Sequence, residues 1–189
     1  MSTNRKKVDI IGELGDECVF VAVKDGGKIN SEGDLKSGVK IAIGDPDAGS
    51  YASWSYLQSL EKDYAKTETY AKGGLRALAK VTTGEYDAFL WVSAMDKSNK
   101  FLDSVNAKDS GLKIIDLNGW HLDDKLPNGK PIYEMKKAVL SSGFFTDNKV
   151  KVPCMKTLVV ANADSGDDLL EQESSIMLKN QARIIGSAQ

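Results

Sequence analysis

Apolar and polar positions alternate along the chain in two kinds of pattern, one typical of strands and one typical of helices. Short apolar runs that end in turn residues predict buried strands, and they cover residues 17–23, 39–43, 86–92, 112–117 and 155–161. Apolar residues three and four positions apart predict helices, and this spacing covers residues 50–65, 75–82, 98–106 and 167–180. Strands that alternate with helices imply a doubly wound, mostly parallel sheet, so we predict an α/β fold.

One stretch between the strands is harder to assign. Residues 118–142 contain two prolines and an Asn-Gly pair, which are typical of turns. The apolar spacing that follows predicts a helix at 133–140. No linker divides the chain, so residues 1–189 are expected to form a single domain.

Composition and charge narrow the function classes. The chain has 189 residues, enough for one well-buried domain, and a formal net charge of -2. It has no basic stripe, which argues against a nucleic-acid partner. No apolar run reaches the roughly 20 residues that a membrane-spanning helix needs. The basic residues 5–7 are followed by Asp9, Gly12 and Glu13 rather than by an apolar core, so no signal peptide is expected. If the chain has its native start, these features predict a cytoplasmic protein.

The most informative segment joins the strand at 39–43 to the helix after it. A Gly-rich loop ends the strand, and Gly49, Ser50 and Ser53 lie where the helix is expected to begin. Serine hydroxyls cap free helix amides, and the partial positive charge of a helix start favours carboxylates and phosphates. We therefore predict an anion receptacle made by Ser50, Ser53 and the amides from Gly49 to Tyr51. The alternative is an ordinary strand-to-helix turn.

A second strand end adds two candidate ligand contacts. Ligands of open α/β sheets bind at the carboxyl ends of strands, and the strand at 86–92 is followed by a short polar stretch. Trp91 could stack on the apolar part of a ligand, and Asp96 could accept a hydrogen bond from an amino group. The alternatives are a core aromatic for Trp91 and a helix cap or solvated acid for Asp96.

The sequence gives only weak signals for metal binding, catalysis or a phosphate loop. Asp45–Gly49 has part of the acidic spacing of a calcium loop but lacks its later Glu, and residues 162–168 are more typical of a helix start. His121 is the only histidine, and no Cys or Ser nucleophile motif lies beside it. Gly73 and Gly74 lack the lysine and hydroxyl of a phosphate loop. We therefore expect no metal, no cofactor and no catalysis, although an enzyme on this fold is an alternative.

Four segments, in order, resemble those of one family. Residues 17–25 resemble a strand and turn that lead into its second lobe, and residues 34–53 resemble its Asp-Leu-x-Gly, strand, Gly-Ser signature. Residues 83–89 are similar to a Gly-x-x-Asp-Ala step, and residues 152–164 to the strand that returns to the first lobe. On these segments the chain resembles the TAXI-type solute-binding proteins of TRAP transporters, which have the type II periplasmic-binding-protein fold. Where family members often have Gly-Ser-Gly-Thr, residues 49–52 are Gly-Ser-Tyr-Ala.

The resemblance implies a fold, a function and partners. It implies a ligand-binding lobe at about 34–145, with hinge strands and a remnant of the first lobe at 8–25 and 152–180. It also implies a small anionic or zwitterionic solute, a carboxylate or an amino acid, that is handed to membrane transporter subunits from the periplasm. The alternative is a free-standing lobe that acts as a structural or interaction protein, pairing its exposed hinge strands with another copy or with a partner lobe.

Two cysteines, Cys18 and Cys154, lie in or beside apolar strand-like segments, which predicts buried free thiols. The resemblance implies that they begin two antiparallel hinge strands. The two residues would then lie toward opposite ends, too far apart for a disulfide, whose Cα atoms must lie within about 7 Å.

Overall fold

A computed structural model of the chain shows two compact units. Unit 1 consists of Met1–Glu17 and Lys156–Gln189, and unit 2 consists of Cys18–Met155. Strands β1 (Val8–Lys24) and β7 (Asn148–Asn162) each continue along the chain from one unit into the other. The expected boundaries of the lobe and the hinge segments stay a prediction. The structure describes residues 7–94, 99–119, 122, 125, 129–141, 148–164 and 166–187.

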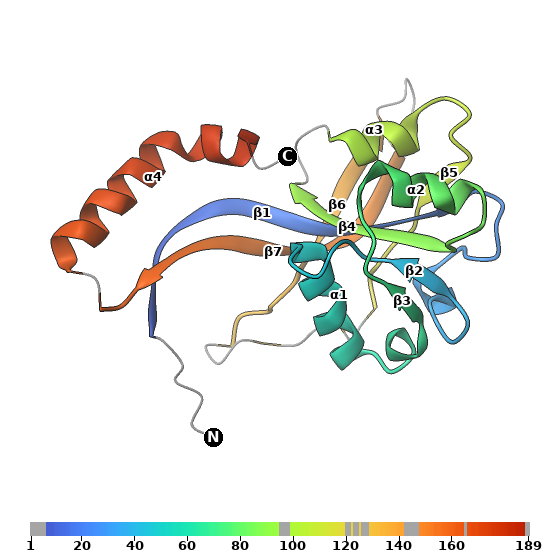
Figure 1. Cartoon of the computed structure of the whole chain (residues 1–189), viewed down its shortest axis with the longest axis horizontal. Helices are drawn as coiled ribbons and strands as arrows, with labels where there is room; N and C mark the ends of the chain where they lie inside the picture. The colour runs from blue at the N-terminus through green and yellow to red at the C-terminus, as the bar shows by residue number, and fades with distance from the viewer. Residues whose placement is uncertain are drawn as a thin grey trace. The chain divides into compact units, whose positions relative to one another are not determined.

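The strands form a sheet with the order β3-β2-β4-β1-β7-β6, and β5 pairs with β1 (Figure 1). Its remaining strands are β2 (Lys40–Ala42), β3 (Glu68–Tyr70), β4 (Ala88–Ala94), β5 (Leu112–Ile114) and β6 (Glu134–Ser141). β2 runs parallel to both of its neighbours, β3 and β4. β5 is antiparallel to β1, and β6 is antiparallel to β7.

Helices cover both faces of the sheet in unit 2. They are α1 (Gly49–Leu60), α2 (Gly74–Thr82) and α3 (Lys100–Asn106). α1 packs on one face through Trp54 and Leu57, and α2 and α3 pack on the other through Leu78 and Leu102. Successive residues of β4 alternate between these two cores, as the pleat of a strand requires. The predicted doubly wound α/β fold class is confirmed.

Two short 3-10 turns complete unit 2, at Glu32–Asp34 and Tyr64–Lys66. The first lies between β1 and β2. The second explains why α1 ends at Leu60 rather than near residue 65. Glu61 has an extended backbone, which interrupts the helix before the 3-10 turn begins.

Unit 1 consists of the remaining parts of β1 and β7 and one helix, α4 (Asp167–Ser187). The amide of Ala163, just after β7, donates to the carbonyl of Lys7, just before β1 (3.1 Å). Met177 of α4 packs closely on β1, since a Cβ added to Gly12 would lie 2.6 Å from its terminal carbon. No helix in the described part of the chain is both long and apolar enough to cross a membrane.

The expected helix at 133–140 is wrong, because these residues form most of strand β6. Ala138 is buried while Met135 and Val139 are exposed, which is the two-residue alternation of a strand. Pairing with β7 places Glu134 opposite Cys154 and continues along the strand. The apolar spacing fits a helix as well as a strand here, and the neighbouring strand decides between them.

The two cysteines form a disulfide, which overturns the expectation of free thiols. Their Cα atoms lie 3.9 Å apart. β1 and β7 are neighbours in the sheet, and each extends several residues beyond its cysteine in both directions. Cys18 and Cys154 therefore lie in the middle of adjacent strands rather than at their opposite ends.

Candidate functional site

The predicted receptacle lies at the carboxyl edge of the parallel strands. β2, β3 and β4 are parallel, so their carboxyl ends share one edge of the sheet. The chain leaves β2 to form α1 on one face and leaves β4 to form α3 on the other. Open α/β sheets bind ligands where the connections of neighbouring strands turn to opposite faces. The segment after β2 occupies that position.

The loop after β2 is held against the segment after β3. The amide of Ile43 donates to the carbonyl of Tyr70 (3.1 Å), and the amide of Gly44 donates to the carbonyl of Lys72 (2.9 Å). Gly44 then turns with a φ of 87°, a conformation that favours glycine. A Cβ added to Gly73, the residue before α2, would lie 3.2 Å from the Cα of Gly44. The starts of α1 and α2 therefore meet at one loop.

The first turn of α1 leaves two amides available. Ala48 is the N-cap residue and makes no side-chain capping bond, so the expected capping by Ser50 and Ser53 is wrong. A cap must precede the helix, whereas both serines lie inside it. The amide of Tyr51 already donates to the carbonyl of Ala48 (3.0 Å). In the described part of the chain, the amides of Gly49 and Ser50 have no acceptor.

The charges around this point are mixed. Neither α1 nor α2 has an acidic residue in its first turn, so the positive end of each helix dipole is not neutralised from within the helix. Lys72 precedes α2 and Arg76 lies in its first turn, and both are exposed. Asp45 and Asp47 are exposed in the loop before α1. The loop thus carries carboxylates and the α2 side carries cations.

The serine side chains are buried beneath the surface. Ser50 and Ser53 are 9% and 8% exposed. The hydroxyl of Ser50 lies so close to Gly44 that a Cβ on that glycine would overlap it. Burial raises the pKa of Tyr133 to about 12, and the hydroxyl of Ser53 has a smaller, opposing effect on that pKa. The two serines therefore shape the floor beneath the amides.

The structure does not bring Trp91 together with Ser50. Trp91 is 3% exposed and lies in the core that α2 and α3 cover, stacked on Phe20 and Phe89 (ring centroids 5.3 and 5.8 Å). Its buried indole N–H has no hydrogen-bond partner in the described part of the chain. Asp96 lies outside the described residues, and so does His121.

Asn99 is a residue of this edge that sequence reasoning missed. It is the N-cap of α3, and its side-chain oxygen accepts from the amides of Phe101 (3.0 Å) and Leu102 (2.9 Å). Its amide nitrogen also donates to the hydroxyl of Ser93 near the end of β4 (2.9 Å). The signal was present, since an asparagine just before an apolar helical pattern is a common cap.

Among the residues that the structure describes, no three His, Cys, Asp or Glu side chains are grouped to hold a metal ion. At the second acidic stretch, the amide of Asp164 donates to the side chain of Asn162 (3.2 Å), which is a local turn.

No protein-family model matches the chain, and neither does any curated protein. Among solved structures, the chain is similar to the cysteine-binding protein of Campylobacter jejuni, with 16% identity, a TM-score of 0.46, and coverage of 96% of this chain and 55% of that one. It is also similar to the arginine-, lysine-, histidine-binding protein ArtJ of Geobacillus stearothermophilus, with 12% identity and a TM-score of 0.46. The match covers 96% of this chain and 62% of ArtJ.

A third similar structure is the second substrate-binding domain of a proposed amino acid ABC transporter of Streptococcus pneumoniae, with 16% identity and a TM-score of 0.39. The match covers 97% of this chain and 64% of that domain. The chain therefore spans less than two thirds of the length of these structures. None of the three is described as a TRAP receptor, so the TRAP and TAXI assignment stays a prediction. The three structures named here are substrate-binding proteins or domains.

Proposed function

We propose that the chain is a binding module, without catalysis, that holds a small anionic or zwitterionic solute at the start of α1. One observation carries the proposal. The amides of Gly49 and Ser50 have no acceptor among the described residues, at a loop that the start of α2 also contacts. Helix starts attract anions because free amides and the helix dipole both favour negative charge. A carboxylate of the solute would accept from these two amides.

The charges near the loop favour a zwitterion such as an amino acid over a dicarboxylate. Asp45 and Asp47 are exposed beside the proposed carboxylate position, and they would repel a second negative charge and attract an amino group. Asp96 remains a proposed partner of that amino group. Tyr51 and Ser53 would complete the shape of the site.

The transporter class and the compartment belong to the same proposal. A TRAP-type transporter of the TAXI kind is supported by the four segments that resemble that family. A periplasmic location is supported by the bond between Cys18 and Cys154, because disulfides persist in oxidising compartments and are rare in the cytoplasm.

Substitutions at Gly49 test the site, since this residue is the first of α1. Gly49→Pro removes one amide donor, and proline is well tolerated at the first helical position. The preceding residue, Ala48, is already extended, as a residue before proline must be. Gly49→Ala is the matched control, because it keeps the amide and its Cβ meets nothing within 4 Å.

Isothermal titration with L-glutamate, L-arginine, L-cysteine and succinate supplies the measurement. A hydrogen bond to a charged group contributes about 1.5–3 kcal/mol, so Gly49→Pro should weaken binding of the amino acids at least about tenfold relative to Gly49→Ala. Equal affinity of the two variants would refute the site at α1. Failure of every solute to bind would refute the binding function itself.

A further inference from the structure

The described side chains of unit 1 form almost no buried core. Among the unit 1 residues whose side chains the structure describes (7–17, 156–164 and 166–180), Met177 is the one buried apolar side chain. A two-stranded ribbon with a single helix is marginally stable in water, because it buries little apolar surface. The exposed apolar surface of unit 1 is therefore suited to burial against another surface.

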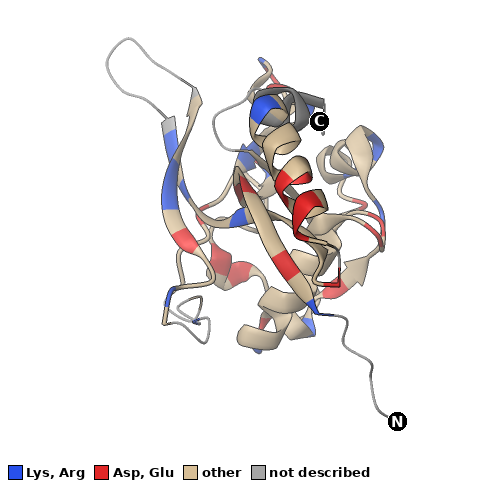
Figure 2. Cartoon of the chain, turned by 90° about the vertical axis from the view of Figure 1, so that its left-hand side faces the viewer, with Lys and Arg blue, Asp and Glu red and all other residues tan. Residues whose placement is uncertain are grey.

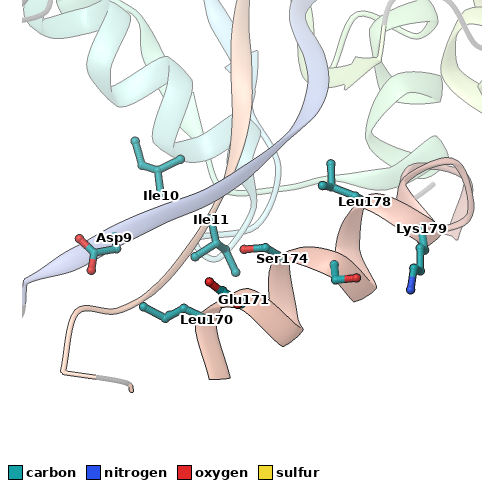
Figure 3. A pocket seen from close by; sticks show the side chains of 9 residues that line it. Asp9, Ile10, Ile11, Leu170, Glu171, Ser174, Leu178 and Lys179 are labelled. Atoms are coloured by element: carbon teal, nitrogen blue, oxygen red, sulfur yellow. The ribbon is translucent and has the colours of Figure 1, made fainter. Parts of the chain in front are cut away.

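Figure 3 shows the residues of β1 and α4 that line a groove in unit 1. Ile11 of β1 points toward Ser174 of α4, and beside them lies an open groove of about 740 Å³. Leu178 lines this groove and is 65% exposed. Apolar side chains of β1 and α4 thus line a groove that is open to solvent.

The exposed apolar side chains concentrate on this unit. Ten large apolar side chains in the described part of the chain are exposed, and seven of them belong to unit 1: Val8, Ile10, Leu158, Val160, Leu169, Ile176 and Leu178. Leu158 and Val160 alternate with half-buried residues, so they lie on one face of the ribbon. Leu169 and Ile176 are about two helical turns apart and so share one side of α4.

Charge divides α4 into two halves and identifies what could cover it. Acidic residues lie at 167, 168, 171 and 173, whereas residues 174–187 carry two cations and no acid. Figure 2 shows the acidic residues gathered toward one end of the helix. Two such helices side by side in parallel would bring like charges together, whereas an antiparallel pair puts each acidic half beside a basic half. A second copy of α4 is therefore the complementary occupant.

We infer that two copies of the chain associate through unit 1, with the two α4 helices antiparallel and Ile176 at the two-fold axis. A two-fold interface is self-complementary, because the same surface serves on both copies. The axis brings the two Ile176 side chains together. It also places Glu173 level with the partner's Lys179, since each residue lies three positions from the axis. The solute site at α1 belongs to unit 2 and takes no part in this association.

Cysteine crosslinking tests the register. Ile176→Cys should form a disulfide-linked dimer under mild oxidation, because the two positions meet at the axis. Leu169→Cys should not, because its two copies would lie about 20 Å apart along antiparallel helices. Leu75→Cys, at an exposed leucine of unit 2, is the matched control. Equal crosslinking at 169 and 176, or at 75 and 176, would overturn the antiparallel arrangement.

Sedimentation over a range of protein concentration tests the association itself. Ile176→Asp should raise the dimer dissociation constant at least about tenfold, whereas Leu75→Asp should leave it unchanged. Lys179→Glu should raise the dimer dissociation constant about fivefold, and adding Glu173→Lys to that variant should return the constant to the wild-type value. A wild-type chain that stays monomeric at every concentration would overturn the inference, and so would one that dimerises equally well with Ile176→Asp. Binding of a foreign protein or an apolar ligand to such a monomer would mean that a different occupant covers unit 1.

Discussion

Gly44 is the single residue on which the shape of the proposed site most depends. Its φ of 87° suits glycine, and a Cβ at this position would overlap the hydroxyl of Ser50. Gly44→Ala should therefore cost about 2–4 kcal/mol of folding free energy, of which about 1–2 kcal/mol is the backbone conformation and the rest is the overlap.

A double-mutant cycle separates these two costs. In a Ser50→Ala background the overlapping hydroxyl is gone, so Gly44→Ala should cost only the conformational part, about 1–2 kcal/mol. Urea unfolding of the four proteins gives the comparison. A cost that is the same in both backgrounds would show that Ser50 does not press on Gly44.

Tyr133, which lies near Ser53, makes the free energy of unfolding depend on pH at high pH. Burial raises its pKa from 10.0 to about 12. The folded state thus keeps a proton that the unfolded state loses first, so this contribution is fully present below pH 10 and is lost as the pH rises from 10 to 12. The shift corresponds to about 2–3 kcal/mol.

Replacing the hydroxyl should remove that pH dependence. Tyr133→Phe should unfold with a shallower fall in free energy between pH 10 and 12 than the wild type, as measured by urea denaturation at each pH. Part of the fall should remain, because burial also raises the pKa of Tyr64. An unchanged slope in Tyr133→Phe would contradict the buried position of this tyrosine.

Among the elements, α3 depends on one side chain for its start. Asn99 satisfies two amides of the helix and also holds Ser93 of β4. Asn99→Ala should lower the free energy of unfolding by about 1–2 kcal/mol. Asn99→Asp keeps the capping oxygens and should lose distinctly less. Urea denaturation measures both, and equal losses would mean that the cap is not what stabilises α3.

The type of an element was predictable from the sequence where its apolar residues followed one clear periodicity. α2 and the strand β2 are examples, because each is a short apolar pattern bounded by glycines. β6 was not, because residues 133–140 fit both periods and only the pairing with β7 selects the strand. The early start of β1 at Val8 was missed for a related reason. Asp9, Gly12 and Glu13 interrupt its apolar pattern, and the part of the strand that contains them belongs to unit 1, where few residues are buried.

The position of the candidate site was predictable, but its details were not. A strand followed by a Gly-rich loop and a helix localises the free amides to a few residues. Which residue caps α1 depends on backbone angles at Ala48, which the composition of the loop does not determine. The contact between Gly44 and Gly73 joins residues from different connections, so no local pattern could reveal that two helix starts meet there.

At the scale of the whole molecule, the disulfide marks the border between the two units. Cys18 and Cys154 are separated by 136 positions, and they enclose almost all of unit 2, which spans Cys18–Met155. Residues of unit 1 lie outside this loop on both sides. A disulfide stabilises mainly by restricting the unfolded state of the loop it closes, which for a loop of this length amounts to up to about 5 kcal/mol.

Reduction should therefore destabilise the two units unequally. Hydrogen exchange should show that amides of β2 and β4 lose protection by up to about 5 kcal/mol after reduction, whereas those of α4 change little. Cys18→Ala/Cys154→Ala should behave like the reduced wild type, and adding reductant to it should change nothing further. Before reduction, neither cysteine should react with iodoacetamide. If α4 lost as much protection as β4, the two units would unfold together, and the division of the chain at the disulfide would have no thermodynamic meaning.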